Sequence, residues 1–305
     1  MVDLSVNMFG IDFKNPVFAA SGTAGYGIEL VHYIDLEKIG ALITKGVSPK
    51  PKSGNPQPRI IETPSGILNS IGLQNIGVKR LIDEVLPELE KYDTSVIVNI
   101  FGDDIDGYIN VAGAFLNEDR VDALEVNLSC PNVKEGGIAF GRDPKISAEI
   151  TSAVVEASQK PVIAKLTPNV TDIAPIAKAV EEAGAAAVSV VNTLLGMAVD
   201  VETRRPYFKN VTAGLSGPAI RPVALRFVWE TARAVKIPVI GIGGITSGKD
   251  ALEFIMAGAA AVQVGSANLV DPGVISNVID EIEDYCTKNG ISDLKEIRGI
   301  IKEEI

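Results

Sequence analysis

The chain has 305 residues, with 28 Lys and Arg against 39 Asp and Glu, which gives a formal net charge of −11. This acidic balance, without a run of five or more basic residues, excludes the usual basic type of nucleic-acid-binding protein. Hydrophobic residues make up 46% and charged residues 22% of the chain, which is typical of a globular protein rather than a disordered or collagen-like one.

The predicted elements begin with a hairpin over residues 5–15, turning at Gly10, which we expect to plug one end of the fold. Short apolar runs typical of buried parallel strands follow at 17–20, 41–44, 96–100, 123–128, 162–166, 187–191, 239–242 and 261–264. Helical patterns lie at 28–39, 81–92, 143–159, 172–183, 222–235, 249–257 and 272–289. The alternation predicts one domain, residues 1–305, folded as an α/β (β/α)8 TIM barrel.

Polar residues gather where the predicted strands end. In a parallel barrel all these ends point to one face, which is where active sites of this fold lie. The residues at or just after the eight ends are Ser21, Lys45, Asn99, Asn127, Lys165, Asn192, Gly243 and Gly265. Two long strand intervals, 46–95 and 193–238, leave from the same face, and we expect them to wall or cover a site.

Glycines after the last two strands indicate a phosphate site. Gly243 and Gly244 follow the seventh strand, and Gly265 and Ser266 follow the eighth, where this fold usually binds phosphate. Tight turns between strand and helix also use glycine, so the glycines alone are a weak signal. A phosphate-bearing flavin would bring its pyrimidine edge toward cationic groups such as Lys45 and Lys165, whose alternative role is an ion pair with a carboxylate.

The loop after the fourth strand carries Cys130, followed by several glycines that are typical of a lid. A cysteine there is either a catalytic base or nucleophile, or a small buried residue. The other cysteine, Cys286, is expected to pack in the last helix, and the single histidine, His32, to be structural. We expect no metal site, because the acidic residues at 103–106 are more typical of a helix start. The role of Arg204 and Arg205 stays open.

Taken in order, the motifs resemble the class 1 dihydroorotate dehydrogenases over almost the whole chain. They are 21–22, 44–46, 69–75, Asn99, 127–132, 165–169, 192–193, 214–217, 243–244 and 265–266. The stretches 165–169 and 217–222 are similar to class 1B catalytic subunits rather than to the fumarate-using class 1A enzymes.

The resemblance implies an FMN-dependent oxidation of (S)-dihydroorotate to orotate in pyrimidine (UMP) biosynthesis. Cys130 would remove the C5 proton while a hydride passes from C6 to flavin N5. The residues implied to bind substrate are Lys45, Asn69, Ser70, Ile71, Gly72, Leu73, Asn127, Asn192 and Thr193, with Asn132 in the matching motif. Those implied to bind FMN are Ser21, Lys45, Gly46, Asn99, Asn127, Lys165, Val191, Gly217, Gly243, Gly244, Gly265 and Ser266.

The chain has only two cysteines and no CxxC pair, too few to hold its own iron–sulfur cluster. Class 1B resemblance therefore implies a partner, an iron–sulfur flavoprotein that carries FAD and a 2Fe–2S cluster and passes electrons to NAD. It also implies a heterotetramer of two chains of each kind, built on a catalytic homodimer. Without a signal peptide or a membrane-spanning run we expect a cytoplasmic address and no membrane partner.

Four other interpretations remain open at this stage. One is an FMN barrel that acts on a neutral dihydropyrimidine such as dihydrouracil, and another is a fumarate-using class 1A enzyme. A barrel without flavin would be a lyase or isomerase of sugar phosphates. A flavin-bearing scaffold would have no catalysis of its own. The colour of the protein and the reduction of its flavin by each substrate separate these cases.

Overall fold

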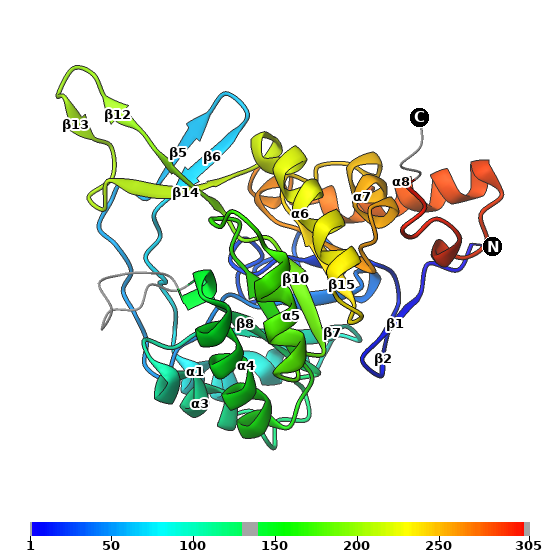
Figure 1. The fold of residues 1–305 in the computed structure, drawn as a ribbon, viewed down its shortest axis with the longest axis horizontal. Coiled ribbons are helices and arrows are strands. Elements are labelled where there is room, and N and C mark those ends of the chain that lie inside the picture. The colour runs from blue at the N-terminus through cyan, green and yellow to red at the C-terminus, as the bar shows by residue number, and fades with distance from the viewer. Residues whose placement is uncertain (1, 130–139, 302–305) are drawn as a thin grey trace.

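The computed structural model describes residues 2–129 and 140–301. Eight parallel strands close into a barrel in which each strand pairs with the barrel strands that precede and follow it in sequence (Figure 1). They are β3 (Val17–Ala19), β4 (Ala41–Ile43), β7 (Ser95–Ile100), β8 (Ala123–Asn127), β9 (Val162–Leu166), β10 (Ala187–Val190), β15 (Val239–Ile242) and β16 (Ala261–Val264). The predicted (β/α)8 barrel is confirmed, and every strand end agrees with its prediction to within one residue.

Helices cover the outside of the barrel (Figure 1). They are α1 (Val78–Arg80), continued by a π-helical turn (Leu81–Val85) into α2 (Leu86–Leu89), and α3 (Ile105–Gly113), α4 (Pro144–Ser158), α5 (Ala174–Glu182), α6 (Arg221–Ala234), α7 (Gly248–Met256) and α8 (Val274–Asn289). Short 3-10 turns lie at Leu36–Lys38, Phe140–Arg142, Pro218–Ile220, Ser266–Leu269 and Leu294–Glu296. Asp104 caps α3 by accepting from the Gly107 amide, so the acidic residues there do begin a helix.

The helix predicted at 28–39 is wrong. Residues 28–33 continue a series of turns and bends that begins at residue 21 and includes two glycines of positive φ, Gly25 and Gly27. Asp35 then caps a separate 3-10 turn by accepting from the Glu37 amide. The apolar spacing was typical of a helix, but the positive φ of these glycines and the cap at Asp35 divide the connection over residues 20–40 into separate turns. His32 is exposed on this connection.

The first two strands close the amino-terminal end of the barrel. β1 (Val6–Met8) pairs antiparallel with β2 (Ile11–Phe13). Met8 and Phe13 are buried and belong to the same apolar cluster as Phe18, Ile163 and Ile240 from inside the barrel. The predicted plug is therefore confirmed, and the barrel opens only at its other end, where the strands finish.

The two long insertions build one second sheet. β5 (Ile60–Thr63) and β6 (Gly66–Asn69) come from the first insertion, and β11 (Leu194–Met197) and β14 (Thr212–Ser216) from the second. They pair antiparallel in the order β11-β14-β6-β5. A small hairpin of β12 (Val199–Asp200) and β13 (Arg205–Pro206) projects beyond this sheet, away from the barrel (Figure 1). The predicted wall on the active face is thus a single structure.

Among the described residues, no helix combines the length and the hydropathy that crossing a bilayer requires.

The second sheet and its hairpin leave apolar side chains exposed, namely Ile60, Leu195, Met197, Val199, Val201, Tyr207 and Val211. Clustered apolar exposure of this kind is typical of surfaces that contact another protein.

Candidate active site

Strand alternation sends every second side chain into the barrel. Ala123, Ile163, Ala187 and Ala261 form the inner apolar cluster with the plug, whereas their sequence neighbours pack outward against the helices. Two residues further along the same four strands, the inward positions are polar: Glu125, Lys165, Ser189 and Gln263. All four are buried, so the barrel carries a polar layer between its apolar floor and its open end.

Glu125 is the centre of this layer and is fully buried. Its Oε1 accepts from Asn99 Nδ2 at 2.7 Å and from Lys165 Nζ at 3.2 Å. Its Oε2 accepts from Ser189 Oγ at 2.8 Å and from Gln263 Nε2 at 2.7 Å. Two predicted cofactor residues, Asn99 and Lys165, are therefore brought together by a residue that the sequence interpretation did not name.

The charge of Glu125 is stabilised by its partners. Burial by itself raises the pKa of this carboxyl, but the Lys165 ammonium and the hydrogen bonds from Gln263, Asn99 and Ser189 together hold the pKa below its ordinary value of 4.5. Glu125 is therefore an anion at neutral pH inside the barrel. A charged residue within the apolar run 123–128 was the available signal for it, because a buried charge needs a partner.

Asparagines from the ends of β8 and β10, the two neighbours of β9, meet at the barrel mouth. Asn192 follows β10, and its Nδ2 donates to Asn127 Oδ1 at the end of β8 over 3.3 Å. The same Asn127 oxygen accepts from the Ser129 amide at 3.1 Å. Asn192 Oδ1 in turn accepts from the Thr193 amide at 2.8 Å. These hydrogen bonds orient the amide groups at the barrel mouth.

The second sheet adds Asn69 to this side. Asn69 ends β6, and its Nδ2 donates to the Gly214 carbonyl of β14 over 3.3 Å. A Cβ on Gly214 would lie 2.3 Å from Thr193 Oγ1, so glycine is required for Thr193 to pack here. Asn69 and Thr193 therefore lie on either side of the same glycine, although they are 124 positions apart in sequence.

The segment 70–73 is a tight turn next to the loop around Asn55. Asn55 Nδ2 donates to Ser70 Oγ at 3.0 Å, and the Asn55 amide donates to the Ile71 carbonyl at 2.9 Å. Gly72 and Leu73 both have positive φ, at 74° and 58°. The backbone of this turn is held from the outside by Asn55.

Lys45 and Gly46 follow β4. A Cβ on Gly46 would lie 2.5 Å from Asn99 Oδ1, so Gly46 packs directly against a member of the polar layer. Lys45 is half-buried, and burial lowers its pKa from the ordinary value of 10.5; nearby Glu29 opposes this shift and Arg59 adds to it. The protein therefore holds a partly desolvated ammonium beside the barrel mouth.

We expect Lys45→Met to make the cofactor-free protein slightly more stable at pH 7. The folded state binds the Lys45 proton more weakly than the unfolded state, so the wild type gains stability as pH rises through the lowered pKa toward 10.5. Methionine removes this penalty, and the difference between the two proteins should shrink as the pH rises. Urea unfolding at pH 7, 9 and 10 checks this, and a variant less stable than wild type at pH 7 contradicts it.

The glycine-rich end lies where the last two barrel strands finish. Gly243 and Gly244 have φ of 136° and 72°, and a Cβ on Gly244 would lie 2.7 Å from the Gly217 carbonyl. Gly217, with φ of 98°, precedes the turn into α6. Ser247 caps α7 by accepting from the Asp250 amide. Three of the predicted cofactor glycines, Gly217, Gly243 and Gly244, thus lie together near the starts of α6 and α7. Helix starts of this kind favour anions.

Gly265 and Ser266 follow β16 beside this stretch. A Cβ on Gly265 would make ordinary van der Waals contact with Ala20 Cβ at 3.5 Å, next to the predicted Ser21. Val191, after β10, is buried and its amide donates to the Ile242 carbonyl. These positions lie at the ends of β3, β10 and β16, in agreement with their predicted place at the barrel mouth.

The described residues suit the FMN that the resemblance implies. Bare glycine backbone serves a phosphate, and Lys45 and Lys165 offer cationic groups to an electron-rich ring. Buried polar atoms without a hydrogen-bond partner in the described part of the chain include Thr44 Oγ1, Ser129 Oγ and Gln263 Oε1. Such atoms are costly unless a ligand or water pairs with them.

Cys130, the predicted base, lies outside the described residues, as does Asn132. The described flanks of this loop are fixed to the barrel. The Leu128 amide donates to the Lys165 carbonyl, and the Gly141 amide donates to the Leu128 carbonyl at 2.7 Å. Both ends of the loop therefore start from the mouth, beside the asparagines described above.

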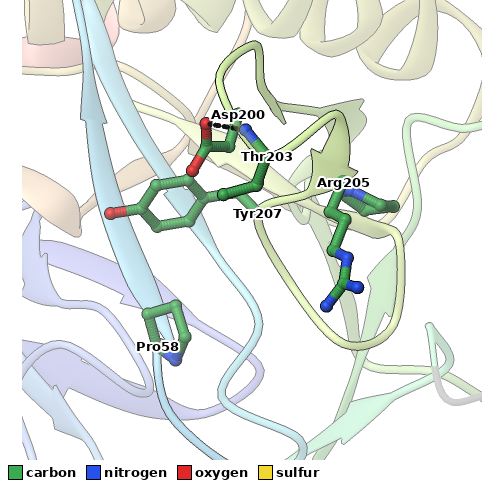
Figure 2. Close-up of a pocket in the computed structure, with 6 residues that line it drawn as sticks. Pro58, Asp200, Thr203, Arg205 and Tyr207 are labelled. Atoms are coloured by element: carbon green, nitrogen blue, oxygen red, sulfur yellow. Dashed lines mark hydrogen bonds between the residues drawn. The ribbon is translucent and has the colours of Figure 1, made fainter.

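Residues predicted to have other roles lie away from the mouth. Cys286 is a buried free thiol in α8, in agreement with a packing role. Arg204 and Arg205 are exposed on the projecting hairpin. A surface pocket of about 560 Å³ lies there, and Figure 2 shows Arg205 extending away from Asp200 and Tyr207 within it. This pocket contains none of the predicted site residues, and in the described part of the chain no group of acidic residues, His or Cys is arranged to hold a metal ion.

The closed barrel, with lysines, amides and glycine backbone at its mouth, defines an enzyme fold of the (β/α)8-barrel class. The sequence pattern of the dihydroorotate dehydrogenases matches residues 3–286. The chain belongs to the dihydroorotate dehydrogenase family.

Similar proteins support this family membership over 98% of the chain. The chain is 56% identical to a protein of Geotalea daltonii and 56% identical to one of Geobacter sulfurreducens, each over 98% of both chains. It is 51% identical to a protein of Pelobacter propionicus over 98% of this chain and 99% of the relative. All three relatives are named dihydroorotate dehydrogenase B (NAD(+)), catalytic subunit.

Proposed function

We propose that this chain is the catalytic subunit of an NAD-linked dihydroorotate dehydrogenase and oxidises (S)-dihydroorotate to orotate in pyrimidine biosynthesis. The observation that carries the proposal is the pairing of Asn192 with Asn127 at the barrel mouth, where Thr193 packs on Gly214, the residue that Asn69 contacts. Lys45 follows β4 at the same end of the barrel. Amides supply both donors and acceptors for a cyclic ureide, and a lysine supplies the charge for its carboxylate. The names of relatives that share 51–56% of its residues support the same activity.

FMN is the proposed cofactor. Its phosphate is assigned to the backbone of Gly217, Gly243, Gly244, Gly265 and Ser266, where glycine backbone near the starts of α6 and α7 favours an anion. Ser21, Lys45, Gly46, Asn99, Asn127, Lys165 and Val191 complete the set. When bound, FMN supplies the acceptor for the hydride that leaves C6 of dihydroorotate.

The chain's own residues have three tasks in this proposal. The asparagines, with Thr193 and the turn 70–73, hold the substrate ring and exclude water from it. Lys45 keeps its charge close to substrate and cofactor together. Cys130 takes the proton from C5; support for this role comes from the sequence, in which the cysteine lies three residues after Asn127 in the loop that leaves β8.

Electrons leave through a second protein in this proposal. The printed names of the relatives contain both "NAD(+)" and "catalytic subunit", which imply another subunit. Two cysteines are too few for an iron–sulfur cluster, so we assign FAD and a 2Fe–2S cluster to the partner and infer a heterotetramer on a catalytic homodimer. The exposed apolar side chains of the second sheet are compatible with such an assembly. The free buried thiol of Cys286 agrees with a cytoplasmic location.

The test is an anaerobic half-reaction. The purified chain, reconstituted with FMN, is mixed with dihydroorotate, and the flavin absorbance near roughly 450 nm is followed. We expect rapid bleaching with dihydroorotate and little with dihydrouracil. Bleaching by dihydrouracil alone points to a neutral dihydropyrimidine as substrate, and failure to bind FMN removes the flavin proposal altogether.

The acceptor is tested separately. After reduction by dihydroorotate, the chain is offered fumarate, or NAD together with a class 1B electron-transfer subunit. We expect reoxidation only in the second case. Efficient turnover with fumarate and no binding of the iron–sulfur flavoprotein in a pull-down would place the chain with the class 1A enzymes.

A further inference from the structure

The carboxylate of Glu125 has no acceptor capacity to spare. A carboxylate offers about four lone-pair sites, and here four donors from β7, β9, β10 and β16 occupy them. A group so fully bonded does not shuttle protons or bind substrate. It fixes its partners instead, and two of those partners, Asn99 and Lys165, belong to the proposed cofactor site.

Few charged side chains are buried in the described part of the chain. The buried charged side chains of the described residues are Glu125, Lys165 and Asp250. Asp250 belongs to α7 and pairs with Arg221 outside the barrel. Glu125 is therefore the anion of the polar layer, and Lys165, whose side chain is 8% exposed, is its cation.

An ion pair of this kind acts strongly on its surroundings. In the interior the effective dielectric constant is far below that of water, so fixed charges influence neighbouring groups over several ångströms. A flavin gains negative charge when it is reduced; a nearby ammonium favours that change and a nearby carboxylate opposes it.

We propose that Glu125 is a positioning residue of the cofactor site, which holds Lys165 and Asn99 in place and supplies a buried negative charge that limits how readily the bound flavin is reduced. This inference rests on the proposed binding of FMN. The retained anion has a structural reason as well, because a buried ammonium without a partner would destabilise the barrel.

The test is the midpoint potential of bound FMN in the reconstituted protein, with the variant Glu125→Gln against wild type. Glutamine keeps the shape and removes the negative charge. We expect the ratio of reduced to oxidised flavin, at a fixed solution potential, to rise at least tenfold, which is about 30 mV for a two-electron couple.

Ser189→Ala is the matched control, because it removes one donor of the same layer and keeps both charges. It should lower the stability of the cofactor-free protein and change the flavin ratio by less than threefold. Lys165→Met should shift the ratio in the opposite direction, and the double variant Glu125→Gln/Lys165→Met should lie close to wild type. A purely structural role for Glu125 predicts similar ratios in the Glu125 and Ser189 variants.

The proposal is overturned if the ratio of reduced to oxidised flavin in Glu125→Gln stays within threefold of the wild-type ratio. It is also overturned if that ratio falls, which would mean that the flavin is reduced less readily. Should Glu125→Gln not retain FMN, the double variant is compared with Lys165→Met; there too, loss of the carboxylate must raise the ratio tenfold, and equal ratios overturn the proposal. The half-reaction of the wild-type protein tests the proposed function separately from this inference. A wild type that binds FMN and bleaches with dihydroorotate supports the function whichever way the Glu125 comparison comes out.

Discussion

Cys130→Ala is expected to slow the anaerobic reduction of bound FMN by dihydroorotate by about 10² or more. Alanine leaves the substrate-binding amides in place but removes the group that takes the C5 proton, so the rate should fall while substrate affinity changes little. Cys130→Ser should remain slow at neutral pH, because a hydroxyl is much harder to deprotonate than a thiol. Stopped-flow absorbance at several dihydroorotate concentrations separates the rate from the affinity.

The matched control for this experiment is Cys286→Ala. It removes the other cysteine of the chain, which is buried in α8 and packs in the outer core. We expect its half-reaction to equal that of wild type, with a modest loss of stability from the cavity. A normal rate in Cys130→Ala would assign proton removal to a different group.

The second large effect is expected for Lys165→Met. The change leaves Glu125 buried without its cation, and breaking a buried pair by removing one partner costs about 3–5 kcal/mol of stability. FMN affinity should fall about tenfold or more, since a charged contact at the cofactor site is lost. Urea unfolding of the cofactor-free protein and FMN fluorescence titration measure the two losses independently.

The pH dependence of this loss has a definite sign. In the wild type the lowered pKa of Glu125 contributes stability above pH 4.5, which is lost as the pH falls through the folded pKa. Without Lys165, burial should raise that pKa above 4.5, so the variant's deficit is largest at neutral pH and shrinks on acidification. Lys79→Met, which removes an exposed lysine paired with Asp83, is the control and should change little. A deficit that is constant from pH 7 to pH 5 contradicts this account.

The barrel strands were predictable because they are buried on both faces and therefore appear as uninterrupted apolar runs. The residues at their carboxyl ends followed from the same pattern, since a parallel barrel brings all those ends together. The closure of the amino-terminal end by β1 and β2 was also predictable. A short apolar hairpin directly before β3 must bury its side chains, and the nearest apolar surface is that end of the barrel.

Glu125 and Gln263 were not predicted, because the interpretation took one residue at or after each strand end, and for β8 and β16 these were Asn127 and Gly265. Their meeting depends on barrel closure, which brings β8 and β16 into contact across the interior over a separation of 138 positions. The pairing of the two insertions into one sheet could not be predicted from the sequence either, since nothing local in residues 60–69 specifies β14 as the neighbouring strand.

That long-range pairing has a consequence for how the protein is made. β6 cannot pair with β14 until about two thirds of the chain has left the ribosome. Contacts between residues so far apart in sequence form late in folding. Closure of the barrel spans a still longer separation, because β16 pairs with β3 between Val262 and Val17, so both the wall and the closed barrel form late. Substitutions in the sheet should therefore accelerate unfolding and leave the folding rate nearly unchanged, so that the half-life of the native protein, rather than its yield during synthesis, responds to changes in this wall.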